Sequence, residues 1–199
     1  MKKGLLIALF MSLIFGTTVF AQPDEIKFRG HEWGDDINKI AETEVTDDMV
    51  EDVDYAFSDG VLILIKGTVS VFDCYTYFNF NENNKLYSGI YLLTEKHASD
   101  NTYYEDFLSL EEALTSVYGR ATISKDNWKD DLYKDDPEDI GIAIAAEHLT
   151  LYRQWTAKDG SSCTLACYGD NFNISNVIYY DAPTSVDLKP EDNSKTNGL

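Results

Sequence analysis

Two groups of short, strand-like segments constrain the fold of this chain more than any other feature. The first group consists of Val61–Ile65, Val69–Phe80 and Leu86–Leu93, with an Asn-rich turn at Asn81–Asn84. Runs of apolar, β-branched and aromatic residues separated by short turns pair with their neighbours, so this group predicts an antiparallel meander. A shorter strand at Val53–Phe57, closed by a Ser-Asp-Gly turn, is expected to precede it. Large side chains alternate on both faces, which predicts a sheet that is covered in part on both sides.

The second group follows the same logic near the end of the chain. Leu149–Thr156 alternates strictly between apolar and polar residues, and an Asp-Gly turn leads into Ser162–Tyr168. A second turn, Gly169–Asn171, leads into Asn173–Tyr180. Alternation with a period of two is typical of half-buried strands, so these segments predict a second antiparallel meander.

Each group of strands is preceded by a helical signal. Asp35 is placed to cap a short helix that begins near Ile37. Thr102 and Glu105 have the spacing of a capping box, and apolar residues at helical intervals continue from there to Gly119, which is a natural helix stop. A long helix is therefore predicted before the second meander.

The stretch between that helix and the second meander is strongly acidic. Residues 126–139 contain seven acids and two lysines, and residues 121–139 are predicted to form an exposed excursion. Pro137 has the position of a first helical residue, so a short helix through Ala145 is expected, with a strand as the alternative.

The order of elements predicts an α+β fold in which antiparallel meanders pack with a few helices. The last hairpins of the two groups can be laid over one another, so we expect two tandem units, 22–95 and 96–181. The remaining segment, 182–199, has two prolines and few apolar residues, and it is predicted to be a disordered tail.

Residues 1–21 have the pattern of a secretory signal peptide. Lys2 and Lys3 precede an apolar run of 12 residues, and Val19 and Ala21 occupy the small-residue positions before a cut. A membrane anchor requires about 20 apolar residues, which makes that alternative less favoured. The sequence thus predicts an exported protein of the bacterial periplasm or exterior with no membrane span in its mature form.

Charge narrows the choice of partners. The chain has a formal net charge of -19, which becomes -21 when Lys2 and Lys3 are removed with the leader. Binding to nucleic acids or anionic membranes needs a basic face, so neither partner is expected. Residues 42–59 hold eight acids without a lysine or arginine, and with 126–139 they carry most of the charge. An acidic surface favours another exported or surface protein that has a basic face.

The three cysteines do not define one pairing. Cys163 and Cys167 lie in one predicted strand, about 13 Å apart, which is too far for a disulfide. Cys74 could bridge to either of them, or all three could be buried thiols. A CxxxC pair with no third ligand nearby is a weak zinc signal, and the sequence indicates no cofactor.

No established catalytic motif is present. His31 beside Glu32 and Trp33 could bind metal or exchange protons, but a polar edge near a core tryptophan is the favoured interpretation. His97 is expected to be solvated, and His148 beside Glu147 to form a surface pair rather than a catalytic dyad. The chain contains no G-x-S-x-G, H-E-x-x-H, P-loop or G-x-G-x-x-G pattern.

The acidic excursion is the candidate binding site. Its candidate residues are Trp128, Asp130, Asp131, Tyr133, Asp135 and Asp136. Aromatic residues among charges are typical of interface hot spots, although these could equally pack against the sheet. Carboxylates could bind Ca²⁺, but the order does not match an EF-hand loop, and a solvated charge run is favoured.

Several of these features together resemble a family. The Trp33-Gly34-Asp35-Asp36 helix start, the helix end at Tyr118-Gly119, the Trp155 strand and the closing hairpin resemble a group of uncharacterised exported bacterial proteins. Their helix-then-meander units are similar to β-lactamase-inhibitor-protein-like folds, over most of residues 29–181. The resemblance implies binding of another protein, often by an open sheet face, and it assigns no individual residue.

The sequence therefore favours a non-enzymatic exported binding protein. The alternatives are a hydrolase whose carboxylates converge only in the folded chain, and a Ca²⁺-binding envelope protein.

Overall fold

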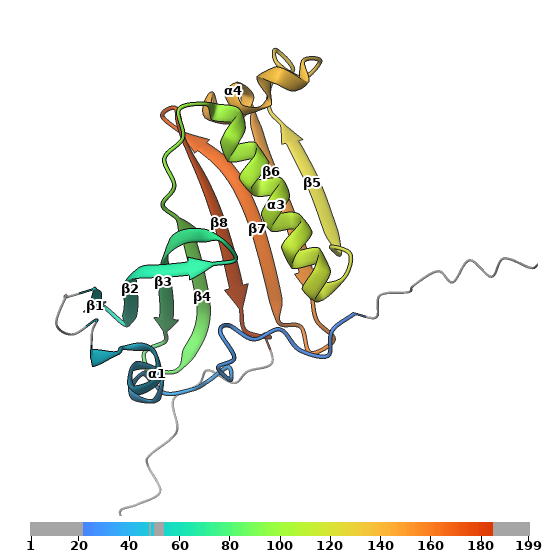
Figure 1. The fold of residues 1–199 in the computed structure, drawn as a ribbon. Helices are drawn as coiled ribbons and strands as arrows, with labels where there is room; N and C mark the ends of the chain where they lie inside the picture. Colours follow the sequence, from blue (N-terminus) through green and yellow to red (C-terminus); the bar gives the residue numbers. More distant parts are fainter. Residues whose placement is uncertain (1–21, 48, 50–53, 185–199) are drawn as a thin grey trace, which may run out of the picture.

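The structure is a computed structural model that describes residues 22–47, 49 and 54–184 (Figure 1). The predicted signal peptide, 1–21, lies outside the described residues, and so does 185–199 of the predicted tail. Residues 182–184 of the predicted tail are described. The amide of Ala182 donates a hydrogen bond to the carbonyl of Tyr87 at 3.0 Å.

A single antiparallel sheet organises the described residues. Its spatial order is β1-β2-β3-β4-β8-β7-β6-β5. The strands are β1 (Tyr55–Ser58), β2 (Val61–Val69), β3 (Phe72–Phe80), β4 (Leu86–Leu93), β5 (Ile123–Trp128), β6 (Leu149–Thr156), β7 (Ser162–Asp170) and β8 (Asn173–Asp181). The α+β class and the antiparallel meanders predicted from the sequence are confirmed.

The two meanders meet at their last strands. Ile90 of β4 lies opposite Tyr179 of β8, so the halves form one continuous sheet rather than two separate sheets. Each half contributes four consecutive strands, β1–β4 and β5–β8. The division into tandem units at 22–95 and 96–181 stays a prediction.

The acidic excursion contains a strand that the sequence did not predict. Residues 123–128 form β5, an edge strand paired with β6, although five of these six residues are exposed. With little apolar content and many charges, the segment lacks the alternation by which a strand is recognised. The turn between β2 and β3 lies at Ser70–Val71, inside the segment that the sequence predicted as one strand from Val69 to Phe80.

The helices are α1 (Ile37–Glu44), α3 (Asp100–Tyr118) and α4 (Ile140–Ala145), the last preceded by a 3₁₀ turn at Pro137–Asp139. The short helix after Pro137 is confirmed, as is the stop at Gly119. Two predicted caps are wrong by a few residues. Asp36 rather than Asp35 caps α1, and α3 begins at Asp100 after Ser99, so Thr102 lies inside the helix. No helix among the described residues has the length and apolarity needed to cross a membrane.

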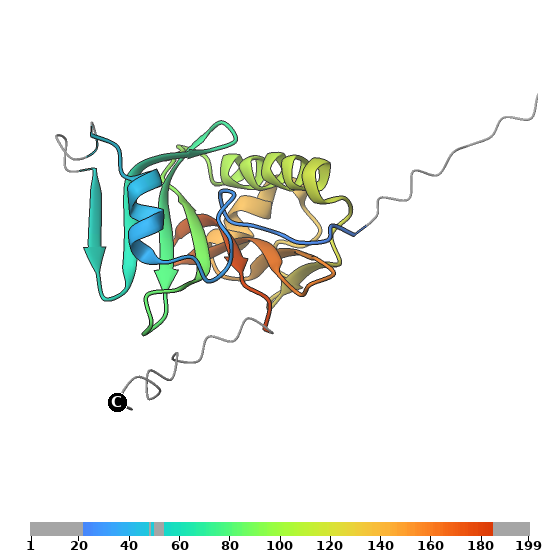
Figure 2. The same cartoon turned by 90° about the horizontal axis from the view of Figure 1, so that it is seen from below.

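The core lies on one face of the sheet. Helix α3 packs on β7 and β8, and the segment that precedes α1 covers β4 (Figure 2). The ring of Phe28 lies 5.0 Å from Phe78 and Tyr91 and 5.2 Å from Tyr180, all on this face. Burial of such aromatic and aliphatic surface is the main stabilising contribution to folding.

The opposite face is covered less completely, with Thr164, Ala166 and Val177 buried and larger side chains partly accessible. The named helices and the segment before α1 all contribute to the single core on the α3 side. Large side chains on the other face, such as Tyr75 at 38% exposure, remain accessible to solvent. We call this second surface the open face.

The cysteines are three free, buried thiols. Cys163 and Cys167 share β7, as predicted. The suggested bridge from Cys74 is not formed, because β3 and β7 are separated by two strands. Three strand spacings of about 4.8 Å place the thiols about 14 Å apart, well beyond disulfide reach.

Candidate functional site

The open face carries two adjacent rows of side chains that run across the sheet. One row consists of Tyr77, Ile90, Tyr179, Thr164, Gln154 and Ile123, on β3, β4, β8, β7, β6 and β5. The second row consists of Tyr75, Leu92, Val177, Ala166, Tyr152 and Lys125 on the same strands. Directly opposite residues in antiparallel strands point to the same face, so each row is one line of neighbours.

The centre of these rows is hollowed. Its lining consists of Tyr77, Ile90, Leu92, Tyr168, Val177 and Tyr179, around a shallow space of about 190 Å³. Burial, together with a hydrogen bond with Tyr168, raises the pKa of Tyr179 to about 12. The hydroxyl of Tyr179 is therefore neutral near pH 7, and the hollow has an aromatic wall with polar tips.

Charge is almost absent from the two rows. Their one charged member is Lys125, which lies on the edge strand. This is unusual for a chain with a net charge of -19. Depletion of charge together with enrichment of tyrosine is what distinguishes the centres of protein interfaces from other surfaces.

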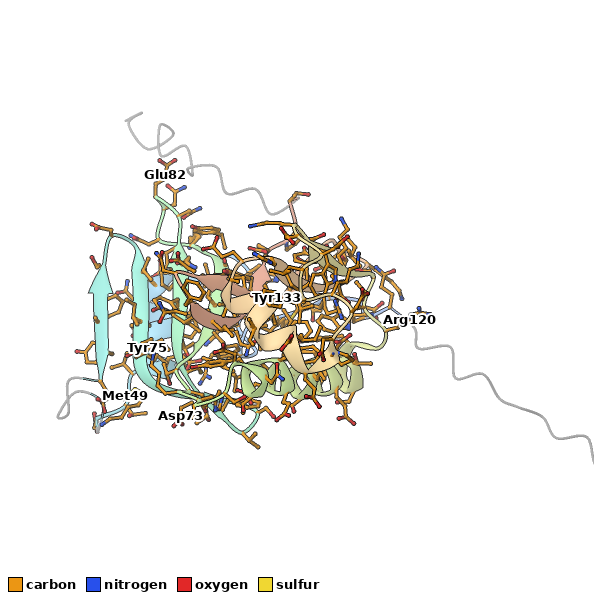
Figure 3. All side chains as sticks on the ribbon, turned by 90° about the horizontal axis from the view of Figure 1, so that it is seen from above. Met49, Asp73, Tyr75, Glu82, Arg120 and Tyr133 are labelled. Atoms are coloured by element: carbon orange, nitrogen blue, oxygen red, sulfur yellow. The ribbon has the colours of Figure 1, made fainter. Side chains whose placement is uncertain are left out.

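The acidic candidate site has a different geometry from the one expected. Trp128 ends β5 and is half-buried against the core, with the Lys134 ammonium 6.0 Å from its ring centroid. Tyr133 is also half-buried, and its ring centroid lies 5.4 Å from that of His148. Figure 3 looks down on this end of the molecule and shows Tyr133 over its middle. Both aromatics therefore serve to hold the acidic loop against the fold.

The carboxylates of the loop are used locally. Asp131 pairs with Lys134 at 2.9 Å, Asp136 accepts the amide of Glu138 at 2.9 Å, and Asp130 accepts the amide of Leu132 at 2.9 Å. Asp135 is exposed. Across the described part of the chain, no three His, Cys, Asp or Glu residues are grouped as a metal site would require. The Ca²⁺ alternative thus has no ligand cluster to support it there.

Each histidine lies beside a carboxylate that is distant from it in the sequence. The Nε2 of His31 lies 2.7 Å from a carboxylate oxygen of Glu44 rather than beside Glu32. Arg29 forms an ion pair with the same carboxylate. His97 is not simply solvated, because its Nε2 lies 2.6 Å from a carboxylate oxygen of the buried Asp106. These pairs tie the segments 28–31 and 94–99 to helices α1 and α3.

The remaining pair is looser. The Nδ1 atom of His148 lies 3.9 Å from Asp130 rather than beside Glu147. Glu147 instead faces the β7–β8 turn, where it accepts the amide of Asn171 at 3.4 Å. A nucleophile bonded to one of these histidines would be needed for a catalytic dyad, and the contacts described for them contain none.

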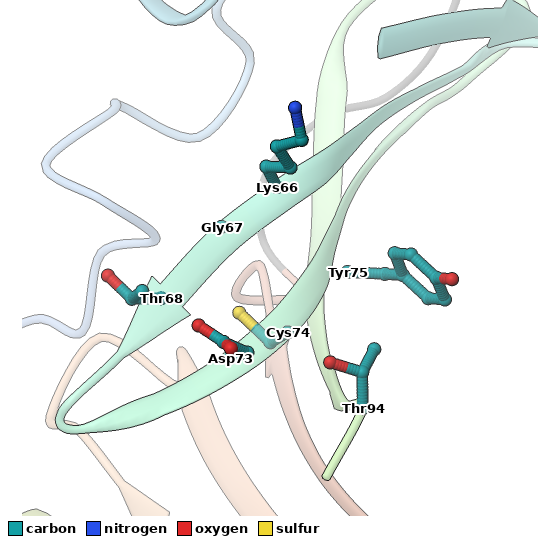
Figure 4. Close-up of a pocket in the computed structure, with 7 residues that line it drawn as sticks. All are labelled: Lys66, Gly67, Thr68, Asp73, Cys74, Tyr75 and Thr94. Atoms are coloured by element: carbon teal, nitrogen blue, oxygen red, sulfur yellow. The ribbon is translucent and has the colours of Figure 1, made fainter. Parts of the chain in front are cut away.

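A larger hollow, at the β2–β3 hairpin, does not assemble catalytic groups. It measures about 510 Å³ and is lined by Lys66, Gly67, Thr68, Asp73, Cys74, Tyr75 and Thr94 (Figure 4). The Cys74 thiol points toward β2, whereas the Tyr75 ring points to the other side. Burial raises the pKa of Cys74, which is the opposite of what a nucleophilic thiol needs.

The carboxylate-based hydrolase also finds no support in these hollows. A glycosidase-type site needs two carboxyl groups about 5–9.5 Å apart in one pocket. In four hollows formed by described residues, the linings include one carboxylate, that of Asp73.

Comparison with known proteins adds no family. The chain has no significant match to a protein-family model, a curated protein or a solved structure.

Proposed function

We propose that this protein is an exported, non-enzymatic binding protein that engages another protein through the open face. The observation that carries the proposal is the pair of nearly uncharged rows with Tyr75, Tyr77, Tyr152 and Tyr179. Tyrosine supplies a large contact area and a hydrogen-bonding tip, and it is enriched among interface hot spots. The hollow of about 190 Å³ at the centre offers a place for one side chain of the partner.

The acidic segments have a separate part in this proposal. The loop that carries Asp130, Asp131, Asp135 and Asp136 lies at one end of the sheet, outside the two rows (Figure 1). Charges at the periphery of an interface mainly raise the association rate and select the partner. A partner with a basic rim around an apolar, hydrogen-bonding centre fits this arrangement.

The test is capture of a partner from exported fractions by the immobilised mature chain. Wild-type protein is expected to retain a partner at about 0.05 M salt and to retain less at about 0.5 M, where screening shortens electrostatic attraction. The double variant Tyr77→Ala/Tyr168→Ala, which removes two aromatic rings from the wall of the hollow, is expected to lose that partner at both concentrations.

Phe172→Ala is the matched control. Phe172 is an aromatic residue at 78% exposure on the β7–β8 turn, outside the two rows. Its removal is expected to leave capture unchanged. Equal capture by the wild type and the double variant would refute the open face as the binding surface.

A further inference from the structure

A third hollow lies where the described chain begins, beside the connection from α3 to β5 (Figures 1 and 2). It measures about 280 Å³. Gln22 and Pro23 form one part of its lining, and Tyr118, Arg120 and Trp155 contribute to the rest. We call it the Gln22 hollow. It shares no lining residue with the hollow of the open face.

Contacts with β6 and the β6–β7 turn hold Gln22 in this hollow. Its side-chain amide donates a hydrogen bond to the carbonyl of Thr156 at 2.7 Å. The carbonyl of Pro23 accepts the amide of Lys158 at 3.0 Å, and the Lys158 ammonium lies 2.7 Å from a carboxylate oxygen of Asp24. None of these contacts involves residues 1–21, so Gln22 should stay in the hollow after the predicted leader is removed.

Removal of the leader gives Gln22 a reactive amine. The predicted cut after Ala21 makes Gln22 the first residue, with a free α-amine and a side-chain amide on the same residue. Two reactants in one molecule react far faster than the same groups in separate molecules. The α-nitrogen attacks Cδ, the new N–Cδ bond closes a lactam ring, and the Cδ–Nε2 bond breaks. Nε2 leaves as ammonia with the proton that the amine gives up, so no other reactant is needed.

The charge of the hollow favours this reaction. Among the described residues that line the hollow, Arg120 is the one with a charged side chain. The nearest carboxylate along the chain, that of Asp24, is already paired with Lys158. The Arg120 guanidinium repels a protonated α-amine and therefore increases the share of the unprotonated amine, which is the nucleophile.

The product suits the hollow better than the starting amine does. The nitrogen of the lactam ring is an amide nitrogen and carries no charge. It is not repelled by Arg120, and it can lie near Trp155 without the cost of removing a charge from water. We propose that Gln22 is a modification site, which becomes a pyroglutamate in the Gln22 hollow after the leader is removed. This proposal rests on the export that is part of the function proposed above.

The test follows the N-terminal peptide of the protein produced with its leader and purified from the exported fraction. The folded protein is incubated at about pH 7, and trypsin then cuts after Lys27. Peptide 22–27 is expected to lose the mass of one ammonia with time. A sample digested at the start corrects for ring closure during the digestion.

The possible peptides separate the two proposals. Peptide 22–27 with an unchanged mass refutes the modification and leaves export intact. A peptide that begins at Gly4, after Lys3, would show that the leader is retained, and it would refute both export and the modification.

Gln22→Asn is the matched control. It keeps an α-amine and a side-chain amide, but ring closure would give a smaller and more strained lactam. The mass of its N-terminal peptide is therefore expected to stay constant. Loss of ammonia from this peptide at the wild-type rate would overturn the proposed ring closure.

Arg120→Gln tests the contribution of charge. Arg120 is exposed, so the fold should persist in circular dichroism. Ring closure in this variant is expected to be about threefold slower than in the wild type at about pH 6.5, where few α-amines are unprotonated. At about pH 9 the two rates should be equal, because most α-amines are then unprotonated in both proteins. Equal rates at both pH values, or the same difference at both, refute ring closure beside Arg120.

Discussion

The hydroxyl of Ser161 accepts a hydrogen bond from the backbone amide of Ile26 at 2.8 Å, across 135 residues of sequence. Neighbouring contacts extend this link, because the amides of Lys158 and Asp159 donate to the carbonyls of Pro23 and Asp24. Residues 22–28 thus form a strap that fastens the β6–β7 turn to the half of the molecule that contains α1. The Nε1 of Trp33 donates to the carbonyl of Ile26 at 2.8 Å and fixes the other end.

Replacement of the strap's buried acceptor should therefore destabilise the fold. Ser161→Ala leaves the buried Ile26 amide without its partner, at a cost of about 1–3 kcal/mol in the free energy of unfolding. Urea unfolding measures this cost. Hydrogen exchange at Ile26 should also accelerate, and Ser124→Ala on the exposed edge strand should change the stability by less than about 0.5 kcal/mol. Equal stabilities of the two variants would show that the strap does not depend on this bond.

The close approach of the Phe28 ring leaves no room for a side chain at Gly89 on β4. A Cβ atom at this position would lie 2.1 Å from the Phe28 ring, which is fully buried against β4. Gly89→Ala should destabilise the protein by about 1–3 kcal/mol or more, because an overpacked ring must leave its place. Gly34→Ala is a useful comparison, because its Cβ would meet no atom within 4 Å and only its φ of 89° causes strain.

A double-mutant cycle isolates the contact between Gly89 and Phe28. Phe28→Leu removes part of the ring that the new methyl group would strike, so the two substitutions should cost less together than the sum of each alone. A coupling of about 0.5–3 kcal/mol is expected for such neighbours. Strict additivity would mean that Gly89 is required for some reason other than the close approach of Phe28.

The three thiols should be unreactive in the native protein. Burial raises the pKa of Cys163 and of Cys167 to about 12, and it also raises that of Cys74. Because the thiolate is the reactive form, an alkylating reagent near pH 8 should leave the folded chain unmodified. In denaturant without reductant, all three cysteines should react. Mass spectrometry counts the adducts, and rapid native labelling or fewer than three adducts after unfolding would contradict this expectation.

The sequence predicted local structure better than it predicted the sheet's assembly. Alternation and turn residues defined β6, β7 and β8, and Gly119 marked the end of α3. The meeting of β4 with β8 could not be predicted, because it depends on contacts between residues as distant as Tyr91 and Ile178. β5 was missed because a pairing partner, rather than its own residues, makes it a strand.

The open face could not be predicted for the same reason, since it depends on how distant segments pack. Tyr75 and Tyr77 were visible as alternating residues in a strand, but the sequence does not say which face of a sheet its helices cover. Only the position of α3 on the side of Cys163 and Leu165 identifies the open face. Trp128 and Tyr133 drew attention because they lie among charges, whereas folding places both against the core.

Alkaline pH should weaken the fold through the same buried groups. The unfolded chain releases the protons of Cys163 and Cys167 near their ordinary pKa of 9.0, whereas the folded chain holds them to about 12. Between these values the native state binds more protons, so the free energy of unfolding decreases as pH rises, by up to about 1.4 kcal/mol per pH unit for each thiol. Tyr179, with its pKa raised from 10.0 to about 12, adds a decrease of the same sign above pH 10. Urea unfolding at about pH 8, 9.5 and 11 should therefore show a progressive loss of stability.

The variant Cys163→Ala/Cys167→Ala should be less stable at pH 8, because it loses packed sulfur atoms, but its stability should fall less steeply above pH 9. The same slope in both proteins would mean that the buried thiols do not cause the alkaline loss.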